Sequence, residues 1–253
     1  MFDLSDQTVL MIGELSDLAA GVAAVFKEAG AEILVVYNST SDPNLLRLYP
    51  DGTYLETSLY DPIELASTLA NYTFQTVVIS PGWFQHRSFL DSNASDIENA
   101  YRINFEHAIY SAQSAAKRLI EQGEGGVILF LSSVVSKMPT VETNLVGSSL
   151  ASLEVIATMA AVDLAQYGIR VNVVAAGWLE NSWAEPLLGV EGRMKEPTDI
   201  PLGKVGSTKS VGQACCFLAS PMAEYITGVV LPVDGGFTLT KSLAQSPYRG
   251  TRQ

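Results

Sequence analysis

Two polar residues of this sequence have side chains that could hold a substrate. Ser133 follows an apolar run, and Asn104 lies in the segment Tyr-Arg-Ile-Asn-Phe. A hydroxyl and a carboxamide can hydrogen-bond a carbonyl or an alcohol, but moving a proton to or from that group requires a general acid or base. Residues 144–150, which follow Ser133 at short distance, offer Val146 and Leu150 four positions apart, and neither side chain can carry a proton.

A turn near the start of the chain has the place of a phosphate-binding loop but unsuitable residues. Gly13-Glu-Leu-Ser-Asp-Leu-Ala19 follows an apolar run. Such turns bind phosphates through bare N–H groups at a helix start. Glu14 and Asp17 would each repel a phosphate charge by roughly 3 kcal/mol at ~5 Å and an effective dielectric of ~20. Asp17 is also a preferred N-cap for a helix that begins at Leu18, so we expect its carboxylate to satisfy N–H groups that a phosphate would bind.

The elements that must position these residues alternate between strand and helix patterns. Continuous apolar strands separated by helices indicate a parallel sheet covered on both faces. The predicted strands are Thr8–Ile12, Glu32–Val36, Thr53–Glu56, Thr76–Ile79, Gly126–Phe130, Arg170–Val174 and Gly228–Leu231. The sequence therefore predicts a single α/β domain of the doubly wound, Rossmann type.

Several motifs, in this order and spacing, resemble those of the short-chain dehydrogenase/reductase superfamily. They are Gly30-Ala31, the segment around Asn104, Ser132-Ser133, Gly168-Ile-Arg-Val-Asn172, and Ile226-Thr-Gly-Val-Val-Leu-Pro-Val-Asp-Gly-Gly236. The resemblance implies a seven-stranded parallel sheet in the order 3-2-1-4-5-6-7. It also places the family's catalytic Tyr and Lys at Val146 and Leu150, and leaves Ser133 and Asn104 as vestiges of the catalytic tetrad. We expect no catalytic residue, with the two vestiges kept for local hydrogen bonds.

The resemblance further implies where NAD(P) would bind, and most of those positions have changed. Of the family's Gly-x-x-x-Gly-x-Gly turn only Gly13 remains, since the second and third glycines are Asp17 and Ala19. Other changed positions are Tyr37 and Asn38 after the second strand, Ser58 after the third, Ile79-Ser-Pro-Gly82 after the fourth, Ala176-Gly177 after the sixth, and Asn181. We therefore expect this chain to bind no cofactor in the usual way.

Composition limits the partners and the location. The 253 residues carry a formal charge of −12 and are 47% hydrophobic. This suits one domain with a large core and lacks the basic surface that nucleic acid or an anionic membrane requires. The acidic start has no basic signal region and no uninterrupted apolar run reaches ~18 residues, so we expect a cytoplasmic protein without a membrane span.

The cysteines and histidines give no sign of a disulfide or a metal site. Cys215 and Cys216 are neighbours on a predicted helix, and we expect both to be reduced thiols in the core. His86 and His107 have no Cys or His companions at metal-ligand spacing, so no metal is expected.

One predicted helix has hardly any polar face. Over Ser148–Tyr167 only Glu154 and Asp163 are charged. A helix that covers a sheet normally shows a broad polar stripe to solvent. We therefore expect its outer face, with Ala157 or Ala161 as candidates, to be buried against another subunit. A helix that is simply well buried within its own chain is the alternative.

The resemblance implies how such an assembly would be built. The family's dimers use this helix and the preceding one, here Tyr101–Leu119, and a second interface uses the strand and turn at Val229–Gly236. We expect the domain to span residues 1–241 and a tail to span residues 242–253. The tail either frays or contacts a neighbouring subunit, since Tyr and Arg are frequent interface residues.

Together these features indicate a non-catalytic member of the superfamily. The chain is similar in pattern to the inactive subunits of heteromeric acyl-CoA dehydrogenases of this family. That resemblance implies a catalytically intact paralogue as partner, in a hetero-oligomer that is expected to be a tetramer. The partner would bind NAD and act on a hydroxyacyl-CoA or another small alcohol or ketone. Two alternatives are an enzyme with altered, cofactor-independent chemistry and a protein that senses a metabolite or nucleotide.

Overall fold

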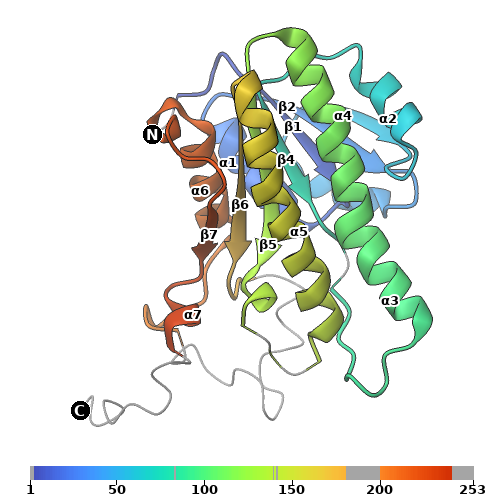
Figure 1. Cartoon of the computed structure of the whole chain (residues 1–253). Coiled ribbons are helices and arrows are strands. Elements are labelled where there is room, and N and C mark those ends of the chain that lie inside the picture. The colour runs from blue at the N-terminus through green and yellow to red at the C-terminus, as the bar shows by residue number, and fades with distance from the viewer. Residues whose placement is uncertain (1–2, 83, 139, 141, 181–199, 241–253) are drawn as a thin grey trace.

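A seven-stranded parallel sheet forms the centre of the molecule (Figure 1). This computed structural model describes residues 3–240 apart from 83, 139, 141 and 181–199. In spatial order the strands are β3 (Thr53–Thr57), β2 (Glu32–Asn38), β1 (Thr8–Gly13), β4 (Thr76–Ser80), β5 (Gly126–Ser133), β6 (Ile169–Ala176) and β7 (Val230–Val233). Every neighbouring pair is parallel. The predicted fold class and strand order are confirmed.

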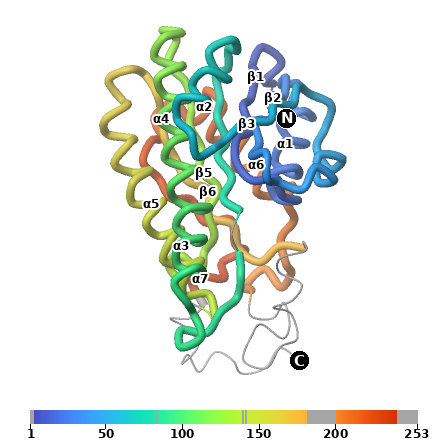
Figure 2. The backbone as a smooth tube through the Cα atoms, turned by 90° about the vertical axis from the view of Figure 1, so that its right-hand side faces the viewer, coloured from blue at the N-terminus to red at the C-terminus, as the bar shows by residue number. Residues whose placement is uncertain are grey.

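Helices cover both faces of the sheet, as the two layers in Figure 2 show. One face carries α1 (Asp17–Glu28), α6 (Thr208–Ala219) and the 3-10 turn η1 (Pro43–Leu48). The other carries α2 (Pro62–Leu69), α3 (Ala94–Tyr101), the π-helical turn η2 (Arg102–Glu106), α4 (His107–Gln122) and α5 (Asn144–Leu164). The short elements are η3 (Val134–Ser136), η4 (Ala165–Tyr167), η7 (Pro221–Ala223) and α7 (Phe237–Thr240).

The predicted strands are all present, and most run one to three residues further than predicted. β5 continues to Ser133 and β6 to Ala176, because the residues after the predicted runs still pair with each other in the sheet, Ser132 with Ala175 and Ser133 with Ala176. β7 begins at Val230, two residues after the predicted start at Gly228. Gly228 adopts φ +77°, a left-handed conformation that ends extended structure.

The two helices on the first face pack unusually closely because each supplies a glycine at the contact. A Cβ at Gly21 would lie 2.2 Å from Thr208 Oγ1, and one at Gly212 would lie 2.7 Å from Val25 Cγ2. The resulting layer also buries Cys215 and Cys216, which are both free thiols, as predicted. Burial raises the pKa of both thiols, that of Cys216 to about 12, so they stay protonated and unreactive.

The helical segment formed by α5 and η4 is long and apolar. The 24 residues Asn144–Tyr167 have a window with a mean hydropathy of 1.7, which makes this the one helix in the described residues that could cross a membrane by length and composition. However, the segment joins β5 and β6, which are neighbours in the same parallel sheet. A crossover between neighbouring parallel strands must return along the sheet, and this accounts for its length.

The two faces of α5 differ from the sequence-based expectation. Ala157 and Ala161, the candidates for the outer face, are only 1% and 3% exposed because they pack in the core against the sheet. Glu154, one of the two charged residues of this helix, is buried. Its Oε1 accepts hydrogen bonds from Ser132 Oγ (2.7 Å) and Ser136 Oγ (2.6 Å). The expectation for Ala157 and Ala161 was wrong because near-uniform hydrophobicity does not indicate which side of a helix faces outward.

Candidate functional site

The carboxyl ends of the strands bring the predicted site residues to one edge of the sheet, where ligands of open α/β folds bind. The turn between β1 and α1 lies there. Its N-cap is Ser16, one residue before the predicted Asp17, because Ser16 has an extended backbone (φ −154°) and its Oγ accepts a hydrogen bond from the Ala19 N–H. Asp17 begins the helix instead.

Three N–H groups of this turn are satisfied by the chain's own side chains. The Ala19 N–H donates to Ser16 Oγ (3.1 Å), and the Leu18 N–H donates to Asp17 Oδ1 (2.8 Å). The Ser16 N–H donates to the hydroxyl of Tyr49 (3.3 Å). The predicted occupation of helix-start donors by Asp17 therefore holds for one donor, and two further side chains serve the others.

Tyr49, whose hydroxyl accepts a hydrogen bond from this turn, is a residue of the site that sequence reasoning missed. It follows η1, within a stretch that carries no strand or helix pattern, and its ring is buried beside Gly13 and Ala19. Burial raises the pKa of its hydroxyl above the usual range, so it remains a neutral partner. A small void of about 10 Å³ remains between this turn, Tyr49 and the ends of β1 and β2. Because three N–H groups of the turn already donate to side chains of the chain itself, the turn as placed does not suit a dinucleotide pyrophosphate.

A second cluster surrounds the carboxylate of Glu14. Its Oε2 accepts from Ser41 Oγ (2.9 Å), and its Oε1 accepts from Asn38 Nδ2 (3.4 Å) and the Tyr60 hydroxyl (3.5 Å). These donors come from the ends of β2 and β3. The family resemblance places a ribose-binding acid at the end of β2, and here the carboxylate at this location belongs to Glu14.

Aromatic and cationic groups complete that cluster. The guanidinium carbon of Arg102 lies 4.4 Å from the centre of the Tyr60 ring, a cation–π contact. The ring of His107 packs edge-on against Tyr60, at 6.2 Å between centroids. Burial lowers the pKa of His107 to about 4, and neither of its ring nitrogens has a hydrogen-bond partner among the described residues. His107 is therefore neutral at pH 7, and Arg102 supplies the positive charge.

The positions of the family's Tyr and Lys lie inside the core. Val146 is 2% exposed and Leu150 is fully buried, and both belong to the apolar cluster that contains Phe130 and Leu153. Neither position holds an ionisable side chain. A Tyr or Lys introduced there would bring a hydroxyl or a charge into an apolar environment.

Ser133 and Asn104 both make hydrogen bonds within the chain, and that of Ser133 is local, as expected, whereas those of Asn104 reach residues distant in sequence. Ser133 is buried at the end of β5, and its Oγ accepts from the Val135 N–H (3.5 Å) as the cap of η3. Asn104 is also buried. Its Oδ1 accepts from the Gly82 N–H (3.2 Å) and its Nδ2 donates to Ser149 Oγ (3.1 Å). These contacts connect α5 and the loop after β4 to η2.

The remaining predicted positions lie around the same edge. Tyr37 is half-buried, and desolvation raises the pKa of its hydroxyl. Ser58 donates its N–H to Glu64 Oε1 (3.1 Å), which ties it to α2. Ala176 is buried at the end of β6 and the Gly177 N–H donates to the Val233 carbonyl (2.9 Å). Asn181 and the tail at residues 242–253 lie outside the described residues.

No metal centre is found in the part of the chain that the structure describes, since no three His, Cys, Asp or Glu side chains converge there. Glu14, Tyr60 and Arg102 are polar groups at this edge that can bind and orient a ligand.

Comparison with known proteins identifies the family. The sequence profile of the family described as enoyl-(acyl carrier protein) reductase matches residues 13–238. The chain therefore belongs to this family of short-chain dehydrogenases/reductases, and it shares the fold of a solved oxidoreductase of that kind.

Known relatives align over almost the entire chain. L-rhamnose 1-dehydrogenase (NAD(P)(+)) of Sphingomonas sp. is 27% identical over 245 residues, 92% of this chain and 96% of the relative. A solved short-chain dehydrogenase/reductase from Mycobacterium marinum is 27% identical with a TM-score of 0.82, covering 94% and 97% of the two chains. A putative 2-deoxy-D-gluconate 3-dehydrogenase from Agrobacterium tumefaciens with bound NADP is 23% identical, with a TM-score of 0.84 over 94% and 98%. At that identity the last likeness supports the fold alone.

Proposed function

We propose that this member of an oxidoreductase family is a non-catalytic subunit that binds no NAD(P) itself and stabilises an active paralogue. The observation that carries the proposal is the occupation of the Ser16, Leu18 and Ala19 N–H groups by the chain's own side chains. In the family these groups are where the cofactor's pyrophosphate would bind. Val146 and Leu150, which stand where the resemblance puts the family's acid/base pair, are buried and have side chains that carry no proton, and this supports the same proposal.

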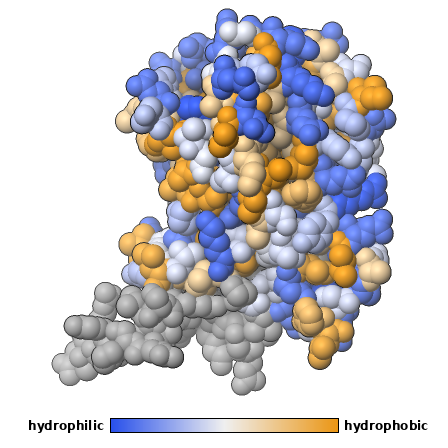
Figure 3. All heavy atoms as spheres, in the orientation of Figure 1, coloured by the Kyte–Doolittle hydropathy of each residue, from blue (hydrophilic) through white to orange (hydrophobic). Residues whose placement is uncertain are grey.

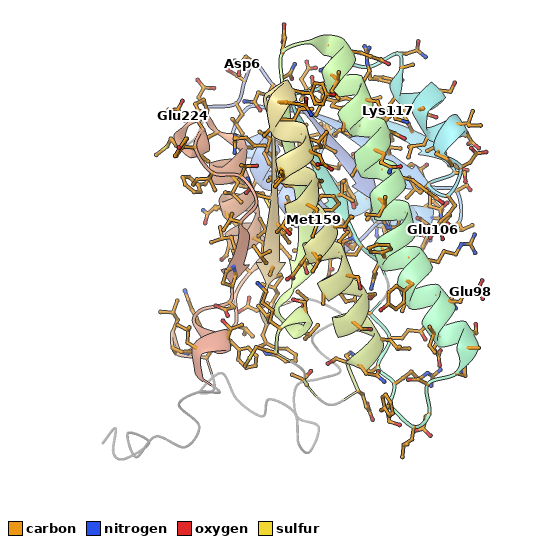
Figure 4. The ribbon with its side chains drawn as sticks, in the orientation of Figure 1. Asp6, Glu98, Glu106, Lys117, Met159 and Glu224 are labelled. Atoms are coloured by element: carbon orange, nitrogen blue, oxygen red, sulfur yellow. The ribbon has the colours of Figure 1, made fainter. Side chains whose placement is uncertain are left out.

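A second observation supports assembly with another subunit. The outward residues of α5 are large and apolar: Val155, Met159 and Val162 are 57%, 60% and 78% exposed. Figure 3 shows hydrophobic residues gathered in the middle of the face that α4 and α5 present, with hydrophilic residues above and to the right. In Figure 4 Met159 lies at the centre of that face. An apolar patch of this kind marks a protein contact in a water-soluble chain.

We infer the kind of partner from the dimers of the family. Those dimers use the helices that correspond to α4 and α5, so a paralogue with the same helices and an intact Tyr-x-x-x-Lys can pair with this face. We propose a heterotetramer in which the paralogue binds NAD and oxidises or reduces a small hydroxyacyl-CoA, alcohol or ketone. A contribution of residues 242–253 to the partner's site belongs to the same proposal.

Cofactor titration tests the first half of the proposal. Calorimetry of the purified chain with NAD⁺, NADH and NADPH should show no binding at about 0.1–1 mM. A cofactor-binding relative, titrated under the same conditions, is the positive control. A micromolar dissociation constant would overturn the proposal, because the N–H groups of the turn would then be available to phosphate.

A matched pair of substitutions tests the second half. Val162→Arg places a charge on the exposed face of α5 and should separate the chain from its partner while leaving its unfolding midpoint nearly unchanged. Ala157→Arg places the same charge in the core and should destabilise the chain by several kcal/mol. Light scattering and urea unfolding distinguish the two effects. If the wild-type chain is a monomer and the paralogue is fully active alone, the subunit role is excluded.

A further inference from the structure

A groove of about 460 Å³ opens at the amino ends of β1, β2 and β3. The walls of this amino-end groove come from the last turn of α1, the first residues of these strands, the two residues before β3, and residues 71–73 between α2 and β4. All of its lining residues lie in the described part of the chain, and its volume is within the range of small-molecule sites. Because the sheet is parallel, the groove lies at the opposite edge from Glu14, which packs against Gly82 at the carboxyl ends of the strands.

Charged side chains from three different elements line the amino-end groove. Lys27 comes from the last turn of α1, Glu32 from the first position of β2, and Asp51 from the segment before β3. All three are exposed, and none of them forms an ion pair or a side-chain hydrogen bond with another described residue. The groove therefore presents one positive and two negative charges that the described part of the chain leaves without partners.

Neutral polar groups line much of the remaining wall. They are the hydroxyls of Thr8, Thr53 and Thr73 and the amide of Asn71. None of these side chains is hydrogen-bonded to another described residue, so their donors and acceptors are available to a ligand. Groups of this kind fix the orientation of a bound small molecule.

The walls of the groove are held together by backbone contacts. A Cβ at Gly52 would lie 2.4 Å from the carbonyl oxygen of Ile33, so glycine at this position lets the wall before β3 lie directly against β2. The carbonyl oxygen of Tyr72 accepts a hydrogen bond from Arg118 Nε (2.9 Å), which ties the wall at residues 71–73 to α4. The groove is therefore formed by the fold itself and does not depend on the position of one long side chain.

We propose that the amino-end groove binds a dibasic amino acid, with the ligand's carboxylate paired with Lys27 and its two cationic groups paired with Glu32 and Asp51. Every charge of such a ligand meets a charge of opposite sign, in hydrogen bonds that are strengthened because both groups are ionised. A dicarboxylate or a phosphate would instead meet two carboxylates, and a diamine would leave Lys27 unpaired. Ion pairs at exposed positions are individually weak, so the expected affinity is in the millimolar range. This binding goes beyond the subunit role and does not depend on it.

L-lysine is a suitable probe, because norleucine lacks only its side-chain ammonium and cadaverine lacks only its carboxylate. In an NMR titration of the full, isotopically labelled chain, L-lysine should shift the backbone amide signals of Gly52, Thr53 and Thr73 with a dissociation constant of about 1 mM. Each analogue should bind about fivefold more weakly, the factor that one exposed ion pair supplies. If L-lysine left these signals unchanged up to about 20 mM, the proposal would be wrong. Equal binding of either analogue would refute the pairing on which the proposal rests.

Three groove variants and two matched controls locate the binding. Lys27→Gln, Glu32→Gln and Asp51→Asn should each weaken L-lysine binding about fivefold or more, because each removes one ion pair. The Lys27 variant should also lose its preference for L-lysine over cadaverine, since the carboxylate then has no partner. Glu98→Gln on α3 (Figure 4) and Lys204→Gln after β6 remove the same kinds of charge from exposed positions elsewhere and should leave the binding unchanged. Unchanged binding in all three groove variants, with unfolding midpoints like wild type, would place the ligand elsewhere and refute the assignment.

Discussion

The turn after β1 and the start of α5 are the two places where the resemblance to the family puts cofactor binding and proton transfer, and their residues are held in different ways. At the turn, polar side chains of Ser16, Asp17 and Tyr49 accept hydrogen bonds from backbone N–H groups. At α5, the apolar side chains of Val146 and Leu150 belong to the core.

The difference predicts how each region responds to change. Removing one side chain that caps a helix-start N–H group costs about 0.5–2 kcal/mol. A buried apolar position accepts an ionisable side chain only at a large cost in stability. The turn should therefore tolerate substitution, whereas the α5 positions should not.

The largest effect is expected for the pair Val146→Tyr and Leu150→Lys. Placing an ammonium without a partner in this core should lower the free energy of unfolding by about 3–5 kcal/mol. No oxidation or reduction with NAD(P) should result, because the turn remains closed. Urea unfolding and absorbance of the reduced nicotinamide measure both outcomes. Leu150→Met, which conserves volume, is the control and should cost less than about 1.5 kcal/mol. Turnover by the double variant would contradict our view of the turn.

The pH dependence of the free energy of unfolding should show whether the buried core around α5 extends to His107 on the neighbouring helix α4. His107 has a folded-state pKa of about 4, below the unfolded value of about 6.5. Above pH 6.5 it is neutral in both states and contributes no pH dependence. As the pH falls from 6.5 toward 4, the unfolded state binds the proton first, so the free energy of unfolding should fall by about 2 kcal/mol between pH 7 and pH 5.

The variant His107→Leu isolates this contribution, because the carboxylates titrate in both proteins. Urea unfolding at pH 7 and pH 5 should show a smaller loss in the variant, by about 2 kcal/mol. An equal fall in the free energy of unfolding in both proteins would mean that His107 is protonated in the folded state. The core at His107 would then be more accessible to water than the core at Leu150.

The smallest effect is expected at the turn itself. Ser16→Ala removes the acceptor for the Ala19 N–H and should lower the free energy of unfolding by about 1 kcal/mol. Ser148→Ala, at an exposed position of α5, is the matched control and should change it by less than about 0.5 kcal/mol. If Ser16→Ala lowered the free energy of unfolding by several kcal/mol, the turn would be as sensitive to substitution as α5 and the expected difference would be wrong.

Sequence reasoning reached the seven strands because they depend on local patterns, namely apolar runs between helical segments, and the resemblance to the family supplied their order. The assignment of Val146 and Leu150 to the family's Tyr and Lys positions stays a prediction from motif spacing. It placed the α1 cap one residue late, since Ser16 and Asp17 are both good capping residues. The contacts of Tyr49 and Glu14 could not be foreseen, because their partners lie 33 residues and 24 to 46 residues away along the chain.

The contact between Glu14 and Gly82 also has an evolutionary consequence. A Cβ at position 82 would lie 2.3 Å from both Cβ and Cγ of Glu14, so a larger residue there requires glycine at position 14 or a shift of the backbone. The two positions should therefore covary among close homologues of this chain. A lineage with any side chain at position 14 would be confined to glycine at position 82, and only glycine at position 14 would release that constraint. The pair thus provides a marker of when, in the descent of this chain, its binding edge diverged.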